Sequence, residues 1–149
     1  MKIQRWFVAL VLVTAAPFVS AKTCAVAITG NDQMQYNLKE IKIAADCTEV
    51  EVTLKHIGKL PVAAMGHNWV LAKTPDMGAV ANAGMPAGLA NNYLPKGDAR
   101  VIASTKIIGG GETTAVKFNI ANLTKGGDYS FFCSFPGHWA MMHGKFIIG

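Results

Sequence analysis

The chain has 149 residues, of which 51% are hydrophobic and 15% are charged, and its formal net charge at pH 7 is +5. This length suits a single domain of ordinary size with a substantial core. The lysines are scattered from Lys22 to Lys145 without a basic stripe or arm, a pattern that argues against nucleic-acid binding.

The first 21 residues have the pattern of a secretory signal peptide. Lys2 and Arg5 give a charged start, residues 6–16 are apolar, and small residues precede a cleavage point after Ala21. The apolar run is shorter than the ~20 residues that span a bilayer. We therefore predict export to the bacterial periplasm, no membrane anchor after cleavage, and a mature chain over 22–149.

The predicted mature chain is only mildly basic. Removing Lys2 and Arg5 leaves 12 basic residues against 9 acidic ones, a net charge of +3. This charge supports no more than a weak preference for acidic partners.

Short β-strands dominate the first part of the mature chain. Residues 24–29, 39–43 and 49–56 are rich in β-branched side chains and are bounded by Gly, Asn, Asp or Pro. In the third segment apolar and polar residues alternate, and His56 falls on the apolar side. We therefore expect His56 to be a hydrogen-bonded core histidine.

The second part of the chain continues this pattern after an insertion. Residues 75–94 are small and apolar, with Gly and Pro, and predict one or two short helices. Later, residues 116–120 alternate, and Tyr129, Phe131 and Cys133 share one face, which turns Cys133 inward. Several strands without helical alternation predict an all-β antiparallel sandwich, in which Trp69 fills the core.

Three cysteines in an exported protein indicate one disulfide and one remaining thiol. Cys24 and Cys47 flank the first two predicted strands, so we pair them. Closing this loop should stabilise the fold by roughly 3 kcal/mol. Cys133 then remains available for chemistry, and the alternative is a buried, inert cysteine.

The densest group of metal-binding side chains lies near the C-terminus. It comprises one thiol, two imidazoles and two thioethers: Cys133, His138, His143, Met141 and Met142. Thiolate and thioether are soft donors, so Cys, His and Met converging on one point favour copper that cycles between Cu(I) and Cu(II). Such copper takes one Cys and two His in a plane, with a weak axial thioether.

A second histidine for such a plane is available upstream. Residues 65–70 (MGHNWV) offer His67, and Gly66 lets the backbone approach closely. Taken alone, His67 would more often be a core or capping histidine. Joined to Cys133, His138 and one methionine, it is better explained as a ligand.

The mature chain resembles the azurins, small blue copper electron carriers of the cupredoxin family. The resemblance runs through residues 31–35 (NDQMQ), 65–70 (MGHNWV) and 132–138 (FCSFPGH) to Met142. Four residues separate Cys133 from His138, and three separate His138 from Met142. The resemblance implies one cupredoxin domain, a Greek-key β-sandwich or barrel, that carries single electrons and is not an enzyme.

The same resemblance implies a ligand set for one copper ion. His67, Cys133 and His138 would form the plane, with Met142 on one axial side and the Gly66 carbonyl opposite.

Two other residues compete for these places. Met141 competes for the axial place, where the family spacing favours Met142. His143 lies one residue beyond the last ligand, and we expect it at the surface.

Residues around the ligands also take roles by resemblance. Asn68 would tie the His67 segment to the Cys133 loop, and amides near Phe135 would donate to the sulfur, whereas Pro136 has no N–H to donate.

The resemblance also implies that the electron leaves through His138, which an apolar docking patch would surround. The patch comprises Met34, Leu60, Met65, Met85, Phe135, Pro136, Trp139, Ala140 and Met141. It suits brief docking of a monomer with a c-type cytochrome, a nitrite reductase or an amine dehydrogenase. Trp139 is larger than the residue many azurins carry there.

Three other functions compete with electron transfer. A Cys133–His hydrolase would need an open nucleophile, an orienting residue and a pocket. A copper chaperone or storage protein could use the same donors but would transfer Cu(I) to an acceptor. A multicopper enzyme would need more histidine clusters than four histidines can form.

Overall fold

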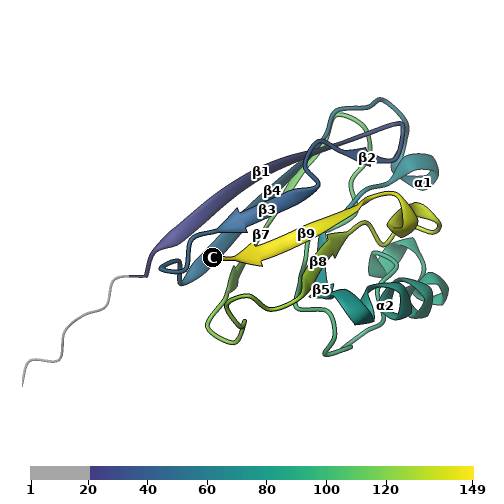
Figure 1. Cartoon of the computed structure of the whole chain (residues 1–149). Coiled ribbons are helices and arrows are strands. Elements are labelled where there is room, and N and C mark those ends of the chain that lie inside the picture. The colour runs from purple at the N-terminus through teal and green to yellow at the C-terminus, as the bar shows by residue number, and fades with distance from the viewer. Residues whose placement is uncertain (1–20) are drawn as a thin grey trace, which may run out of the picture.

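The computed structural model describes residues 21–149, so the predicted signal peptide lies outside the described residues except for Ala21. The strands are β1 (Thr23–Asn31), β2 (Gln35–Tyr36), β3 (Glu40–Ile43), β4 (Glu49–His56), β5 (Val70–Lys73), β6 (Ala103–Ser104), β7 (Thr113–Asn119), β8 (Tyr129–Phe132) and β9 (His143–Ile148). Figure 1 shows two layers of strands, with the short helix α1 (Val62–Met65) at one end of the sandwich and α2 (Met77–Gly84) beside β5. One sheet has the order β2-β1-β4-β7 and the other β3-β9-β8-β5-β6, which confirms the predicted all-β sandwich.

Both sheets are mixed, which corrects the expectation of a purely antiparallel sandwich. β1 pairs in parallel with β4 from Thr23↔Glu49 to Gly30↔His56, and β3 pairs in parallel with β9. The remaining pairs are antiparallel. Parallel neighbours require a crossover connection instead of a hairpin, and the chain makes one by running through the other sheet between β1 and β4. Side-chain alternation is the same for both directions, so it could not predict this.

The core between the sheets follows from side-chain alternation. Val50, Val52 and Leu54 of β4 are fully buried, and His56 at the end of the same face is buried too. From the other sheet, Phe131 and Phe146 pack beside Trp69, with ring centroids 6.1 Å from the indole. The predictions that Trp69 and His56 lie in the core are confirmed.

The predicted insertion forms helices that cover the second sheet. They are η1 (Thr74–Asp76), α2 (Met77–Gly84), η2 (Met85–Ala87) and η3 (Leu89–Asn91). Val80 and Ala81 of α2 pack with Val70, Leu94 and Phe132 in a second apolar cluster, where α2 lies beside β5 in Figure 1. A further short helix, α1 (Val62–Met65), follows Pro61 and was not predicted. Among residues 21–149, no helix has the length and apolar character needed to cross a membrane.

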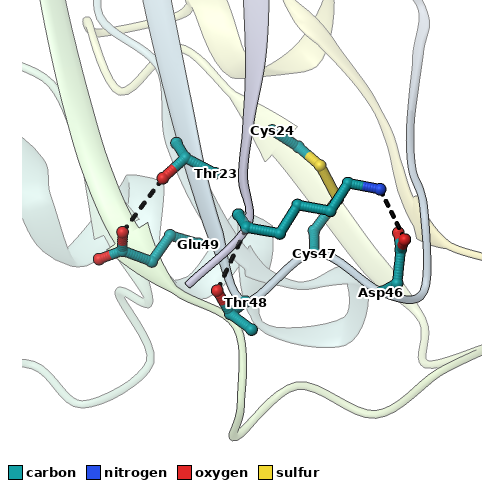
Figure 2. Close-up of a disulfide and its surroundings, with 7 residues drawn as sticks. Thr23, Cys24, Asp46, Cys47, Thr48 and Glu49 are labelled. Atoms are coloured by element: carbon teal, nitrogen blue, oxygen red, sulfur yellow. Dashed lines mark hydrogen bonds and ion pairs between the residues drawn. A yellow bond between two sulfur atoms is a disulfide. The ribbon is translucent and has the colours of Figure 1, made fainter. Parts of the chain in front are cut away.

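The disulfide pairs Cys24 with Cys47, as predicted (Figure 2). It joins the start of β1 to the segment before β4, where Lys22 also pairs with Asp46 at 2.6 Å. Cys24 is in register with Val50, whereas the far end of the same strand pair brings Gly30 close to His67. The disulfide therefore fastens the end of the sandwich opposite His67.

Candidate metal centre

Three buried side chains from three distant segments converge at one end of the sandwich. Cys133 Sγ lies 3.9 Å from His67 Nδ1 and 3.6 Å from His138 Nδ1, and the three donor atoms lie within 4.8 Å of one another. His67 and Cys133 are fully buried and His138 is 3% exposed. The structure thus brings together the three residues that the sequence analysis placed in one plane.

Backbone hydrogen bonds fix each donor segment. His67 exchanges both backbone hydrogen bonds with Ile108, at 3.0 and 2.9 Å. Cys133 follows β8, and its amide donates to the Met142 carbonyl at 3.0 Å. His138 begins the short helix η4 (His138–Ala140) after Gly137, whose φ of 81° is a left-handed conformation that favours glycine.

The turn after His138 separates the two candidate thioethers. The His138 carbonyl accepts from the amides of both Met141 and Met142, at 2.9 and 2.7 Å. Met142 is fully buried in the same core cluster as Cys133, whereas Met141 is 55% exposed. This difference favours Met142 as the axial donor.

The second competing residue, His143, lies outside the cluster. It starts β9, is half-buried, and its Nδ1 lies 2.9 Å from the Trp139 carbonyl. The residue is thus partly exposed, in keeping with the predicted surface position, and this hydrogen bond holds its ring against the turn that carries His138.

Gly66 places its carbonyl oxygen 3.8 Å from Cys133 Sγ. A Cβ at this position would lie 2.6 Å from both the Val62 carbonyl and the Ile107 side chain. Because the Val62 carbonyl is backbone, only glycine fits here without a shift of the chain.

Hydrogen bonds assign the histidine tautomers. His67 Nε2 lies 2.8 Å from the Asn31 carbonyl, so this nitrogen carries the proton and Nδ1 is free to accept. His56 stacks on His67 with centroids 4.3 Å apart. Both nitrogens of His56 have partners, the Met65 carbonyl at 2.9 Å and the Gly58 amide at 3.0 Å, as expected of a hydrogen-bonded core histidine.

Burial keeps the three donors uncharged. It raises the pKa of the Cys133 thiol to about 12, although backbone hydrogen bonds from Asn68 and Phe135 oppose the rise. It lowers the pKa of His138 to about 4, with repulsion from His67 and His56 adding to the effect. Burial also lowers the pKa of His67, against the hydrogen bond to Asn31. Neutral imidazoles are ready to bind a metal, and a cation would have to displace the thiol proton.

The spacing of the donors fits a metal ion. When a thiolate sulfur and an imidazole nitrogen bind the same metal ion at ~2.3 and ~2.0 Å with a trigonal angle, the two atoms stand ~3.7 Å apart. The observed distances from Cys133 Sγ to the two Nδ1 atoms, 3.6 and 3.9 Å, are close to this value. One soft sulfur with two imidazoles, buried beside a thioether, is the donor set that copper prefers.

A second layer of hydrogen bonds joins the two ligand-bearing segments. Asn68 accepts from the Ser134 amide at 2.9 Å through Oδ1 and donates to the Ser134 hydroxyl at 2.8 Å through Nδ2. Asn68 is the residue predicted for this tie, and its partner, Ser134, was not predicted. The Ser134 hydroxyl in turn donates to the Asn92 carbonyl at 2.7 Å, a contact that no motif indicated.

Three residues assigned to the docking patch expose much of their apolar side chains. Leu60, Met85 and Met141 are 42%, 45% and 55% exposed. Of the other residues assigned to the docking patch, Pro136 and Ala140 are exposed, whereas Met34, Met65, Phe135 and Trp139 are partly buried. The Trp139 ring lies against α2, 3.3 Å from where a Cβ on Gly78 would stand, so this side chain also packs the helix onto the ligand turn.

A buried His–Cys–His cluster at one end of a β-sandwich defines a protein of the blue copper class. A family model described as copper binding proteins of the plastocyanin/azurin family matches residues 22–149, and the chain belongs to this family.

Known relatives agree with this assignment. Azurin from Achromobacter denitrificans is 54% identical over 136 residues, covering 91% of each chain. Azurin from Alcaligenes faecalis is 56% identical over 126 residues, covering 85% of this chain and 98% of its own. The solved azurin Az-iso2 from Methylomonas sp. strain J matches with a TM-score of 0.82 and 48% identity, over 85% of this chain and 98% of its own. The chain is therefore a blue copper electron-transfer protein with one copper ion.

Proposed function

We propose that His67, Cys133 and His138 would hold the copper ion as its main ligands, and that Met142 and the Gly66 carbonyl would serve as weaker, axial donors. When bound, copper supplies a one-electron Cu(I)/Cu(II) couple. The observation that carries this proposal is the placement of a fully buried thiol between two imidazole nitrogens at 3.6 and 3.9 Å.

The protein's own groups would hold these donors nearly still. The Asn31 carbonyl fixes the His67 ring, and the amides of Cys133 and Met142 close the ligand loop on itself. Ligands that move little when the charge of the site changes keep the barrier to electron transfer low. Burial also excludes water from the donors, which leaves no position for a substrate.

The same burial supports a carrier over a thiol enzyme. A catalytic cysteine is exposed enough to meet its substrate and has a lowered pKa. Cys133 has no exposed surface, and burial raises its pKa to about 12. We therefore infer that the chain is not an enzyme.

His138 is the proposed exit for the electron. It is the one planar donor with any exposed surface, and its ring lies 4.6 Å from that of Phe135. We propose that a redox protein, such as a c-type cytochrome, a nitrite reductase or an amine dehydrogenase, docks briefly on the apolar surface around His138. Small apolar contacts of this kind suit transient electron transfer by a monomer.

We further propose that the protein works in the periplasm after cleavage of residues 1–21. The Cys24–Cys47 disulfide suits an oxidising compartment. Mass spectrometry of the protein from a periplasmic extract should give an N-terminus at Lys22, and an uncleaved chain would contradict this proposal.

Copper titration of the metal-free mature protein tests the ligand set. Cu(II) should produce an intense blue band that saturates at one copper per chain and bleaches reversibly with ascorbate. Cys133→Ser should abolish the band while the far-ultraviolet circular dichroism stays unchanged. His143→Gln is the matched control, because it removes an imidazole outside the cluster and should keep the band. A blue Cys133→Ser variant would disprove the assignment.

A further inference from the structure

The loop that contains Asn92 touches each segment of the metal centre but supplies none of its donors. Asn92 follows η3 and has a left-handed backbone, with φ of 55°, and Tyr93 after it also has a positive φ of 47°. Asparagine tolerates this conformation better than most residues. Two backbone hydrogen bonds hold the turn: the Asn92 amide donates to the Leu89 carbonyl and the Tyr93 amide donates to the Gly88 carbonyl, both at 2.9 Å.

The Asn92 carbonyl completes the hydrogen bonding of the Ser134 hydroxyl. Ser134 is 1% exposed and directly follows Cys133. Its hydroxyl accepts from Asn68 Nδ2 at 2.8 Å and donates to the Asn92 carbonyl at 2.7 Å. Without this acceptor the hydroxyl proton would be buried without a partner, a state that costs free energy. The Asn92 carbonyl therefore orients the Ser134 hydroxyl so that its oxygen can accept the hydrogen bond from Asn68.

The Asn92 side chain contacts a different segment. Its Oδ1 accepts from the Ile107 amide at 2.9 Å. The Ile107 side chain lies beside Gly66, because a Cβ added to Gly66 would stand 2.6 Å from this side chain. Asn92 thus holds the residue that packs against Gly66.

Tyr93 extends the same contact to the third segment. Its ring meets Phe135 edge-on, with centroids 5.3 Å apart, and Phe135 lies 4.6 Å from the His138 ring. One turn of chain therefore reaches the surroundings of His67, Cys133 and His138 together.

We propose that Asn92 is a positioning residue of the copper site, which locks the Cys133 loop through the Ser134 hydroxyl and the Gly66 segment through Ile107. This inference rests on the proposed ligand set. It assigns the 88–94 loop, which lies on no ligand segment, a role in holding the donors in place.

Alkylation of Cys133 in the metal-free protein measures this role directly. A buried thiol reacts with iodoacetamide only when the loop opens, so the rate reports how firmly the loop is held. Asn92→Gly keeps the left-handed backbone and the carbonyl but removes Oδ1, and Ser134→Ala removes the hydroxyl. Each should speed alkylation roughly five- to thirty-fold, the factor expected for the loss of one buried hydrogen bond.

Asn91→Gly is the matched control. Asn91 is exposed and, within residues 21–149, its side chain donates to the Ala87 carbonyl alone, at 2.8 Å. It should lower the melting temperature without changing the alkylation rate beyond the change in global stability. Asn92→Asp keeps an acceptor for the Ile107 amide and should react at the wild-type rate.

The reduction potential of the copper-loaded variants gives the second readout. Asn92→Gly and Asn91→Gly are both uncharged changes one residue apart, and only the first should shift the potential and the blue band. If Asn92→Gly and Ser134→Ala match Asn91→Gly in alkylation and potential, the positioning role is refuted. A wild-type protein that forms no blue site would instead refute the proposed function.

Discussion

Removing the disulfide should lower stability strongly and leave the copper site unchanged. Cys24 and Cys47 are 23 residues apart, and the loop-closure relation gives about 3.4 kcal/mol at 25 °C for a loop of this length. For a domain of this size, that loss corresponds to a fall in melting temperature of roughly 10 to 15 °C. The double variant Cys24→Ala/Cys47→Ala should show this fall in urea and thermal unfolding of the metal-free protein.

A local control separates the disulfide from its neighbours. Asp46→Ala removes the exposed ion pair with Lys22 beside the bridge, and we expect little change because solvent screens such pairs. The blue band of the double variant should match the wild type, because the bridge lies at the end of the sandwich opposite His67. A double variant within about 1 kcal/mol of the wild type would refute the loop-closure argument, and a displaced blue band would refute the claim that the two ends are independent.

Three further changes test the site, the docking surface and the core. Met142→Leu should raise the reduction potential and keep the colour, because a weak axial thioether stabilises Cu(II) slightly, whereas Met141→Leu should leave the potential unchanged. Lys39 Nζ lies 3.1 Å from the Met141 carbonyl, so Lys39→Glu should slow oxidation of the reduced protein by hexacyanoferrate(III) roughly 3- to 10-fold at 0.1 M salt. Lys125 lies near Cys47, and equal slowing by Lys125→Glu would count against docking near Met141. Leu54→Ala, at a fully buried position, should cost about 2–5 kcal/mol in urea unfolding.

The sequence predicted the strands because burial on one face imposes a period of two. The segment 49–56 corresponds to β4 residue for residue, and its apolar face is the core face. The same alternation carried Cys133 inward. The pairing of β1 with β4 in parallel was missed, since pairing direction depends on how the chain crosses between sheets and leaves no local pattern.

The donor residues could be found because metal chemistry restricts residue types sharply. Few side chains bind copper, and His67, Cys133 and His138 stand in motifs with fixed spacing. The supporting contacts were not predictable in this way. Half of the role proposed for Asn92 uses its backbone carbonyl, a group that every residue has, and this half depends on a backbone conformation that asparagine permits but does not specify.

The donors are held by contacts between protein groups, and this has a consequence for electron transfer. The Asn31 carbonyl orients His67, the Met142 carbonyl accepts from the Cys133 amide, and the turn at Gly137 sets His138. A zinc finger, in contrast, obtains much of its folding energy from its metal. We therefore expect a site assembled by its fold to present nearly the same positions to both oxidation states. The contacts that hold the donors should limit how far the ligands move when one electron is gained or lost, and should thereby help to set the barrier to transfer.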